Sequence, residues 1–319
     1  MAPVPFWLRK AVEAAQTCAP KGLEDAAIAF GAAIAMLDTV VRREERWAGA
    51  WRQRLALSAA AVTAKQAGRV EDEAALRDSL LLTRPGDFLS VGPAGSMLLA
   101  WRRLAVRPAE EVLTAKNLAA VLEEFGYAPD DEALSALADD LRQLGAGAGM
   151  VATLTGTFMA AERHGFGRAV GAWLADALLA QRLGWVHAVP LLGAEAALGA
   201  SARPRRSAAS SVAISIGTDP EHAKGLLAVQ ARAALRAIDL SAELGRRAER
   251  LIAVAPKLRA KGADLVVDQL LNEDALVASR GDKKTGMSDR GLRRLFDKLV
   301  DLGAVRELSG RATFRIYGL

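Results

Sequence analysis

The chain has few of the side chains on which enzyme chemistry most often depends. Among its 319 residues there is one cysteine, Cys18, and there are three histidines, His164, His187 and His222. A single cysteine excludes a disulfide within the chain and a zinc site built from cysteines. No two histidines are three or four residues apart, the spacing that places two metal ligands on one helix face. We therefore expect no metal site and no cofactor, and the sequence indicates no catalytic residue.

Long apolar runs are also missing. The segment Ala26–Leu37 is apolar over only twelve residues, and Leu144–Ala161 is uncharged over eighteen but contains four glycines and three threonines. A membrane-spanning helix needs about 20 strongly apolar residues, so we interpret both segments as buried helices. The first sixteen residues, MAPVPFWLRKAVEAAQ, lack the basic and then apolar pattern of a secretory signal. We expect a cytoplasmic protein without a membrane partner.

The glycine-rich run Gly145–Gly149 differs from a nucleotide-binding loop. It follows an amphipathic helical pattern instead of a strand, and it lacks the Lys-Ser/Thr ending of a P-loop. A turn between two helices explains this run better.

Runs of β-branched residues at strand length are nearly absent before residue 300, whereas alanine is abundant throughout. Alanine loses no side-chain entropy when a helix forms, so this composition favours helix. The chain is 51% hydrophobic and 25% charged, which is typical of a globular protein rather than a disordered one. The sequence therefore predicts an all-α helical body, and its length allows one small domain besides.

Periodic apolar positions, N-caps and breakers divide this body into helices. We predict them at residues 6–17, 24–43, 47–66, 71–83, 94–106, 109–125, 130–144, 151–163, 166–182, 186–200 and 219–255. The last of these is one helix, or two that meet near Gly245. Five tryptophans stand among apolar neighbours at helical spacing, and we expect them to be buried: Trp47, Trp51, Trp101, Trp173 and Trp185.

A polar segment with proline, SARPRRSAASS at Ser201–Ser211, interrupts the helical pattern. Such a composition is typical of a loop or linker. We therefore predict an all-α domain at residues 1–200, a linker at 201–211, a long helix at 212–256 that completes the body, and a small separate domain at 257–319.

Positive charge is concentrated at the end of the chain. The formal net charge is +5, and the last forty residues, 280–319, hold ten basic and five acidic side chains. The preceding 279 residues hold 32 of each and are neutral overall. A neutral body with a cationic end indicates a polyanionic partner at that end.

The pattern of the last domain is typical of a winged helix-turn-helix. We predict helices at 263–272 and 273–279, a polar turn at 280–287, a third helix at 289–302 and two strands at 304–308 and 312–317. Ser288 is a good N-cap for the third helix. The side chains that we expect to be buried are Leu292, Leu295, Phe296 and Leu299 in this helix and Val305, Phe314 and Ile316 in the hairpin.

Such a domain places its third helix in the major groove of double-stranded DNA, and its wing cations meet phosphates. Arginine suits both tasks because its guanidinium can bind a guanine edge or a phosphate through two hydrogen bonds. The residues that we expect to contact DNA are Lys283, Lys284, Ser288, Arg290, Arg293, Arg294, Lys298, Arg306, Arg311 and Arg315. Asp289, Asp297 and Asp301 oppose this interpretation because they would repel phosphate, and small winged domains also bind proteins or form dimers.

The string SDRGLRRLFDKLVDLGAVRELSGRATFRIYGL at the end of the chain resembles the C-terminal end of a bacterial family known as domain of unknown function 1403. Four upstream strings are similar to that family as well: LRDSLLLTRPGD at 76–87, LLAWRR at 98–103, LGWVHAVPLL at 183–192 and APKLRAKGA at 255–263. The resemblance covers most of the chain. It implies a bacterial cytoplasmic protein with a helical body fused to a wing, and it brings no activity and no catalytic residues.

These observations lead to a hypothesis and an alternative. The hypothesis is a DNA-binding regulator or accessory protein, whose body forms a homodimer or senses a small-molecule ligand while the wing binds DNA. The alternative is an enzyme or effector with a site in the body, the wing serving protein interaction. In that case Trp185 and His187, beside Pro190, are the residues that we expect to line a pocket. A histidine packed in the core is the other interpretation of His187, and the scarcity of catalytic groups weighs against an enzyme.

Overall fold

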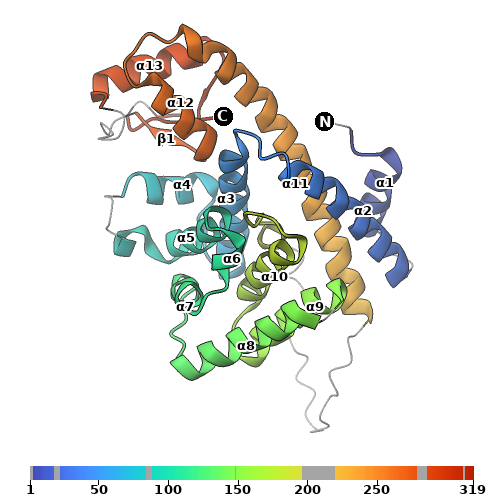
Figure 1. Ribbon diagram of the computed structural model, residues 1–319. Coiled ribbons are helices and arrows are strands. Elements are labelled where there is room, and N and C mark those ends of the chain that lie inside the picture. The colour runs from blue at the N-terminus through green and yellow to red at the C-terminus, as the bar shows by residue number, and fades with distance from the viewer. Residues whose placement is uncertain are drawn as a thin grey trace.

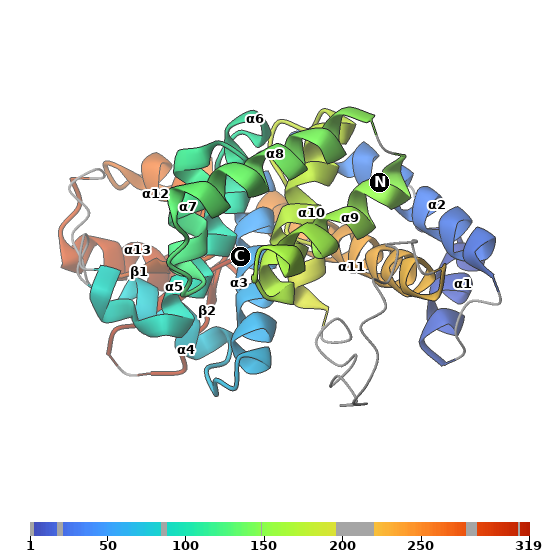
Figure 2. The same cartoon turned by 90° about the horizontal axis from the view of Figure 1, so that it is seen from below.

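The protein is a mostly helical body with a small antiparallel β-sheet in its C-terminal part (Figures 1 and 2). The computed structural model describes residues 3–17, 22–83, 88–147, 149–195, 220–278, 286–311 and 313–319. Cys18 and the linker predicted at 201–211 lie outside these ranges. Within them, no helix combines the length and the apolar character that a membrane span requires.

Most of the predicted helices are confirmed to within a few residues. The body contains α1 (Phe6–Thr17), α2 (Leu23–Val41), α3 (Ala48–Gln66), α4 (Glu73–Leu81), α5 (Gly92–Val106), α6 (Ala109–Val112), α7 (Ala115–Glu124), α8 (Asp131–Gly147), α9 (Met150–Arg163), α10 (Arg168–Leu183) and α11 (Pro220–Val254), with the short 3-10 helices η1 (Phe88–Val91), η2 (Leu192–Ala194) and η4 (Ala255–Lys257). α11 is a single helix that continues through Gly245. It packs along α2, while α3 packs along α5. Figure 1 shows α11 crossing the molecule from the C-terminal sheet to the far end of the body.

Two of the helices predicted in the body are wrong. The helix expected at 109–125 is divided into α6 and α7, because Thr114 has an extended backbone and the Asn117 side chain donates to the Val112 carbonyl (2.6 Å). The helix expected at 186–200 is absent from its described part, 186–195, which is extended and then turns through η2. His187 forms an isolated β-bridge with Pro108 there, and Pro190 lacks the N–H that a helix needs.

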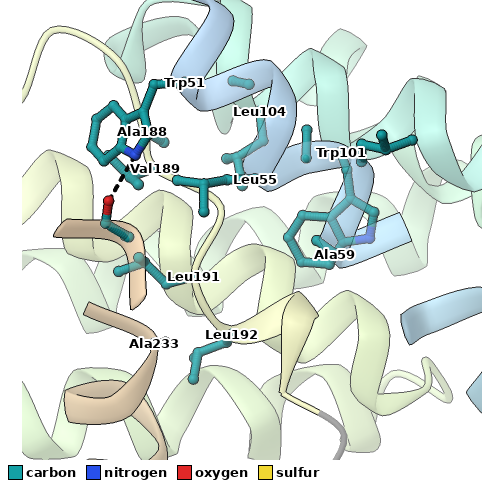
Figure 3. Close-up of a cluster of buried hydrophobic side chains, with 14 of the residues drawn as sticks. Trp51, Leu55, Ala59, Trp101, Leu104, Ala188, Val189, Leu191, Leu192 and Ala233 are labelled. Atoms are coloured by element: carbon teal, nitrogen blue, oxygen red, sulfur yellow. Dashed lines mark hydrogen bonds between the residues drawn. The ribbon is translucent and has the colours of Figure 1, made fainter. Parts of the chain in front are cut away.

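The extended segment is inserted into the core of the body (Figure 3). The buried cluster contains Ala188, Val189, Leu191 and Leu192 of the segment, Trp51, Leu55 and Ala59 of α3, Trp101 and Leu104 of α5, and Ala233 of α11. Trp51 Nε1 donates to the Ala237 carbonyl of α11 (2.9 Å). A Cβ at Gly193 would lie 2.2 Å from the Trp101 ring, so the segment fits only without a side chain there.

Of the five tryptophans predicted to be buried, Trp47 is partly buried and the other four are buried, which confirms the prediction.

A carboxyl group inside the body holds this segment in place. Asp176 of α10 is buried, and its Oδ2 accepts hydrogen bonds from the backbone N–H groups of Leu191 (2.7 Å) and Leu192 (3.0 Å). Burial raises the pKa of Asp176 to about 8, although these two N–H groups and the Gln230 side chain of α11 act against the rise. The carboxyl group is therefore mostly protonated at neutral pH, and it links α10 to the inserted segment without a buried charge.

The raised pKa of Asp176 predicts a pH dependence of stability. Between the unfolded pKa near 3.8 and the folded value of about 8, the folded state holds a proton that the unfolded state has lost. This contribution is fully present below the unfolded pKa and is lost as the pH rises through the folded one. The slope of stability against pH approaches about 1.4 kcal/mol per pH unit.

Asp176→Asn keeps the acceptor oxygen and removes the titration, so the variant should lose less stability on going from pH 5 to pH 8. Urea unfolding of both proteins at several pH values measures this, and parallel profiles would contradict it.

The C-terminal part contains α12 (Ala263–Asn272), β1 (Leu276–Val277), α13 (Asp289–Asp301), β2 (Arg306–Glu307) and β3 (Ile316–Gly318). Its strands form an antiparallel sheet in the order β1-β3-β2. The predicted hairpin is present as β2 and β3, both shorter than expected. The helix predicted at 273–279 is wrong: Leu276 and Val277 pair with Tyr317 and Ile316 of β3. This pairing joins distant parts of the sequence, so no local sequence pattern indicates it.

A buried carboxylate fastens the C-terminal part to the body. Asp274, between α12 and β1, is fully buried and forms ion pairs with Arg54 of α3 and Arg77 of α4. Arg77 Nε donates to Oδ2 (2.6 Å), while Arg54 binds Oδ1 and also donates to the Asp274 carbonyl (3.3 Å). Burial alone would raise the pKa of Asp274, but the two guanidiniums hold it below its usual value. The carboxylate therefore stays charged.

Close packing surrounds this junction. A Cβ at Gly49, in the first turn of α3, would lie 2.6 Å from the side chain and 2.9 Å from the carbonyl of Asn272 at the end of α12. Arg247 of α11 donates to the backbone carbonyl of Leu319 (3.0 Å). The C-terminal part thus contacts α3, α4 and α11, which together determine its orientation.

Removing the charge of Asp274 should destabilise the protein. In Asp274→Asn, the guanidiniums of Arg54 and Arg77 stay largely buried without a counterion, which typically costs about 3–5 kcal/mol. The matched control is Asp139→Asn, which breaks the exposed pair with Arg142 and should cost less than about 1 kcal/mol. Urea unfolding measures both free energies. Equal losses in the two variants would show that Asp274 does not hold the junction.

Candidate nucleic-acid interface

α13 is an amphipathic helix whose apolar side packs on the sheet. Ser288 caps its N-terminus, because the Ser288 hydroxyl oxygen accepts from the Gly291 N–H (3.3 Å). The predicted apolar stripe is buried and consists of Leu292, Leu295, Phe296 and Leu299. The Phe296 ring stacks on Tyr317 of β3, with 4.5 Å between the ring centroids. The opposite side of the helix is consequently left to solvent.

The exposed side of α13 carries four of the predicted DNA contacts. Arg290, Arg293, Arg294 and Lys298 are exposed, and none of them forms an ion pair with another described residue. The three arginines lie in the first two turns, where the helix dipole disfavours positive charge. Asp301 lies in the last turn, where the dipole disfavours negative charge. Helix stability therefore does not explain why these charges stand where they do.

The cations of the hairpin have a different environment. Arg311 forms a two-pronged ion pair with Asp78 of α4, with both N–O distances at 2.7 Å. Arg306 lies 3.6 Å from Glu243 of α11. Arg315 is exposed, its Nε donates to the Arg311 carbonyl (3.2 Å), and a hydrogen bond with Tyr317 raises the pKa of Arg315. Arg306 and Arg311 thus face the body, whereas Arg315 remains beside α13. The predicted contacts Lys283 and Lys284 lie outside the described residues.

A hollow of about 280 Å³ joins α13 to the hairpin. It is lined by Arg293 and Asp297 of α13 and by Ala278, Thr313, Phe314, Arg315 and Tyr317. Two of the predicted cations, Arg293 and Arg315, therefore line the same hollow, and Asp297 is the acidic residue that lines it with them.

The placement of Phe314 corrects the predicted hairpin. Val305 and Ile316 are buried as expected, but the Phe314 side chain is 60% exposed. Its φ of +52° lies in the left-handed region, so a turn precedes β3 and the strand alternation that would bury Phe314 does not reach it. This exposed aromatic ring beside Arg315 is a feature of the surface that the sequence pattern did not reveal.

The two residues expected to line a pocket in the body make structural contacts. Trp185 is buried, and its Nε1 donates to Asp38 of α2 (2.8 Å). His187 is half-buried; burial and the neighbouring Arg52 lower its pKa, against the opposing effect of Glu44. Among the described residues, no group of three His, Cys, Asp or Glu side chains could hold a metal ion.

Sequence reasoning missed the acidic partners of the hairpin and of the junction. Asp78 binds Arg311 across 233 residues, and Asp274 binds Arg54 across 220. The neighbouring residues in the sequence do not distinguish either aspartate from an ordinary polar residue of a helix or loop. Only the three-dimensional contact distinguishes them, so no local signal could have identified them.

The comparisons with known proteins agree with the resemblance seen in the sequence. No curated protein matches the chain. The family match extends over residues 1–319 and carries the description protein of unknown function (DUF1403), which names no activity. Whatever this protein does must therefore be argued from its own residues. Since the match covers the whole chain, the protein belongs to the DUF1403 family.

Proposed function

We propose that the protein binds double-stranded DNA, with the segment from α12 to β3 acting as a winged helix-turn-helix domain. The observation that carries this proposal is the row of exposed arginines, Arg290, Arg293 and Arg294, in the first two turns of α13. In helix-turn-helix proteins, residues near the N-terminus of the recognition helix reach the base edges of the major groove. Guanidinium groups suit those edges and the flanking phosphates.

The order of the elements supports α13 as the recognition helix. A helix, a short strand, the cationic helix and a hairpin follow one another, and the last strand lies between the other two. The sheet contacts the apolar side of α13 through Tyr317, so the cationic side points outward. The helix predicted before the turn, at 273–279, is replaced in its described part by β1, and residues 279–285 lie outside the described residues.

The acidic residues of α13 limit which part of it can approach DNA. Asp297 and Asp301 are exposed in the C-terminal half of the helix, whereas Asp289 in its first turn is partly buried, and a carboxylate next to a phosphate is repelled. We therefore expect the N-terminal half to enter the groove, while the C-terminal half stays farther from the phosphates or accepts from a cytosine amino group. This orientation also brings Arg315, beside Arg293, toward the DNA.

The body contributes a fixed support and competing carboxylates. Because Asp274 fastens the C-terminal part, α13 has one orientation relative to the body. Asp78 and Glu243 neutralise Arg311 and Arg306, so either cation can bind a phosphate only by leaving its carboxylate. We expect the main phosphate contacts of the hairpin to come from Arg315.

Removing two arginines from α13 should weaken DNA binding and its dependence on salt. Each lost phosphate contact lowers the slope of log K against log salt by about one, so Arg293→Ala/Arg294→Ala should lower it by up to about two. If one of the two reads a base, the variant should also lose about 1–3 kcal/mol on the preferred sequence alone. The measurement is a binding titration of the full chain on duplex DNA at several salt concentrations.

The matched control for this experiment is Lys65→Ala/Arg69→Ala, which removes two exposed cations at the end of α3. It should leave both the affinity and the salt slope unchanged. No binding at low salt, or equal effects of the two double variants, would contradict the proposal and favour the alternative in which the C-terminal part binds a protein.

Neutralising Asp78 should strengthen DNA binding. Asp78→Asn removes the charge that holds Arg311, so this guanidinium becomes available to a phosphate, and the salt slope should increase by about one. Glu243→Gln is the corresponding test for Arg306, whose 3.6 Å contact is weaker, and its effect should be smaller. The same titrations measure both. An unchanged slope in Asp78→Asn would mean that Arg311 serves only the contact between hairpin and body.

A further inference from the structure

A groove in the helical body lies apart from α13 and its hairpin. It has a volume of about 630 Å³ and is bounded by residues of α6, α7, α8 and α10, whose helices lie together in Figure 2. Sites for small molecules typically have volumes of about 300–1,000 Å³. Leu113 and Thr114, at the break between α6 and α7, form one of its walls. The unexpected division of the predicted helix at 109–125 is thus what shapes this wall.

The inner surface of the groove is apolar. Leu113 and Ala115 line it on one side, and Ala138 and Leu141 of α8 line it on the other. Leu141 is buried, while Leu113 and Ala138 are partly exposed. Small and branched aliphatic side chains of this kind offer apolar contact to a ring or a short alkyl chain, because apolar groups that leave water there gain free energy.

Two guanidinium groups stand at the edge of the groove. Arg182 of α10 donates through Nη1 to the Gly145 carbonyl at the end of α8 (3.0 Å), and Arg142 of α8 pairs with Asp139 (2.7 Å). A guanidinium has five N–H donors, so these contacts orient each group and leave further donors for a ligand. Glu110 is the one acidic residue among those lining the groove, and an anion that binds Arg142 competes with the exposed carboxylate of Asp139.

The wall opposite α8 is held by hydrogen bonds. Gln181 Nε2 donates to the Ala109 carbonyl (2.8 Å), which leaves its Oε1 as an acceptor, and the Ala109 N–H donates to the Val186 carbonyl (2.8 Å). The short helix α6 is in this way bonded to α10 and to the extended segment inserted into the core. These hydrogen bonds hold this wall of the groove in place, so its backbone need not rearrange when a ligand binds.

We propose that this groove binds an amphipathic organic anion, namely a carboxylate or sulfonate that carries a ring or a short alkyl chain. The anionic group binds Arg142 and Arg182, since charge-assisted hydrogen bonds to guanidinium are strong and directional. The apolar part lies on Leu113 and Leu141. The site is separate from the proposed DNA-binding segment, because none of its residues belongs to the segment from α12 to β3.

The test is a fluorescence titration of the full chain with two probes of similar shape. Anilinonaphthalene sulfonate carries an anionic group on its rings, whereas phenylnaphthylamine has the same rings without it. The unmodified protein should bind the sulfonate at one site and more tightly than the neutral probe. In Arg142→Gln/Arg182→Gln, the Kd of the sulfonate should rise at least about tenfold, a loss within the range of charge-assisted hydrogen bonds, while the Kd of the neutral probe should change less than about twofold.

Two further variants separate this site from general surface binding. Arg163→Gln removes an exposed guanidinium of the neighbouring α9 and should leave both Kd values unchanged. Ala115→Phe fills the groove at an exposed position and should weaken both probes at least about tenfold, with circular dichroism confirming that the variant is folded. The proposal is overturned if the sulfonate and the neutral probe bind equally, if the double variant retains its sulfonate affinity, or if Ala115→Phe has no effect.

Discussion

The carboxylate of Asp274 determines where α13 lies relative to the helical body. It is fully buried where it pairs with Arg54 and Arg77, and Arg102 of α5 is near enough for its charge to interact with the same group. Burying one carboxylate and several guanidiniums is expensive, and an apolar contact of the same size would often be more stable. The ionic contact adds a defined geometry to the junction, because each guanidinium binds a carboxylate in only a few arrangements. The orientation of the exposed arginines of α13 relative to the body therefore depends on this buried cluster.

The interior of the body depends on a second constraint of a different kind. A segment without regular structure, 185–191, runs through a core that is otherwise made of helices. At its end the protonated carboxyl group of Asp176 accepts the backbone N–H groups of Leu191 and of Leu192, the first residue of η2. The neutral carboxyl group of Asp176 thus holds a segment in place, as the charged carboxylate of Asp274 does at the junction. The difference follows from the surroundings, since Asp176 faces amide and backbone groups while Asp274 faces cations.

The sequence predicted those elements whose signals are local. Ala263–Asn272 and the Ser288 cap follow from periodicity and capping, and the structure reproduces both. The predictions from the sequence were wrong where contacts between residues far apart in the chain determine the local structure. Leu276 and Val277 became a strand because β3 pairs with them, and residues 186–195 left the helical pattern because Pro108 and Asp176 bind their backbone. For the candidate site, the exposed face of α13 was predictable, but the withdrawal of Arg311 by Asp78 was not, since the partner lies on another helix.

The separation of the junction residues along the chain has a consequence for the order of assembly. Asp274 follows Arg77 by 197 residues and Arg54 by 220, so closing this contact means closing one of the longest loops in the molecule. Synthesis proceeds from the N-terminus, and α3 and α4 therefore emerge long before their acidic partner exists. Until then the two guanidiniums lack the carboxylate that pairs with them in the complete fold. The docking of α12 removes water from all these groups at once, which makes it a late and cooperative event.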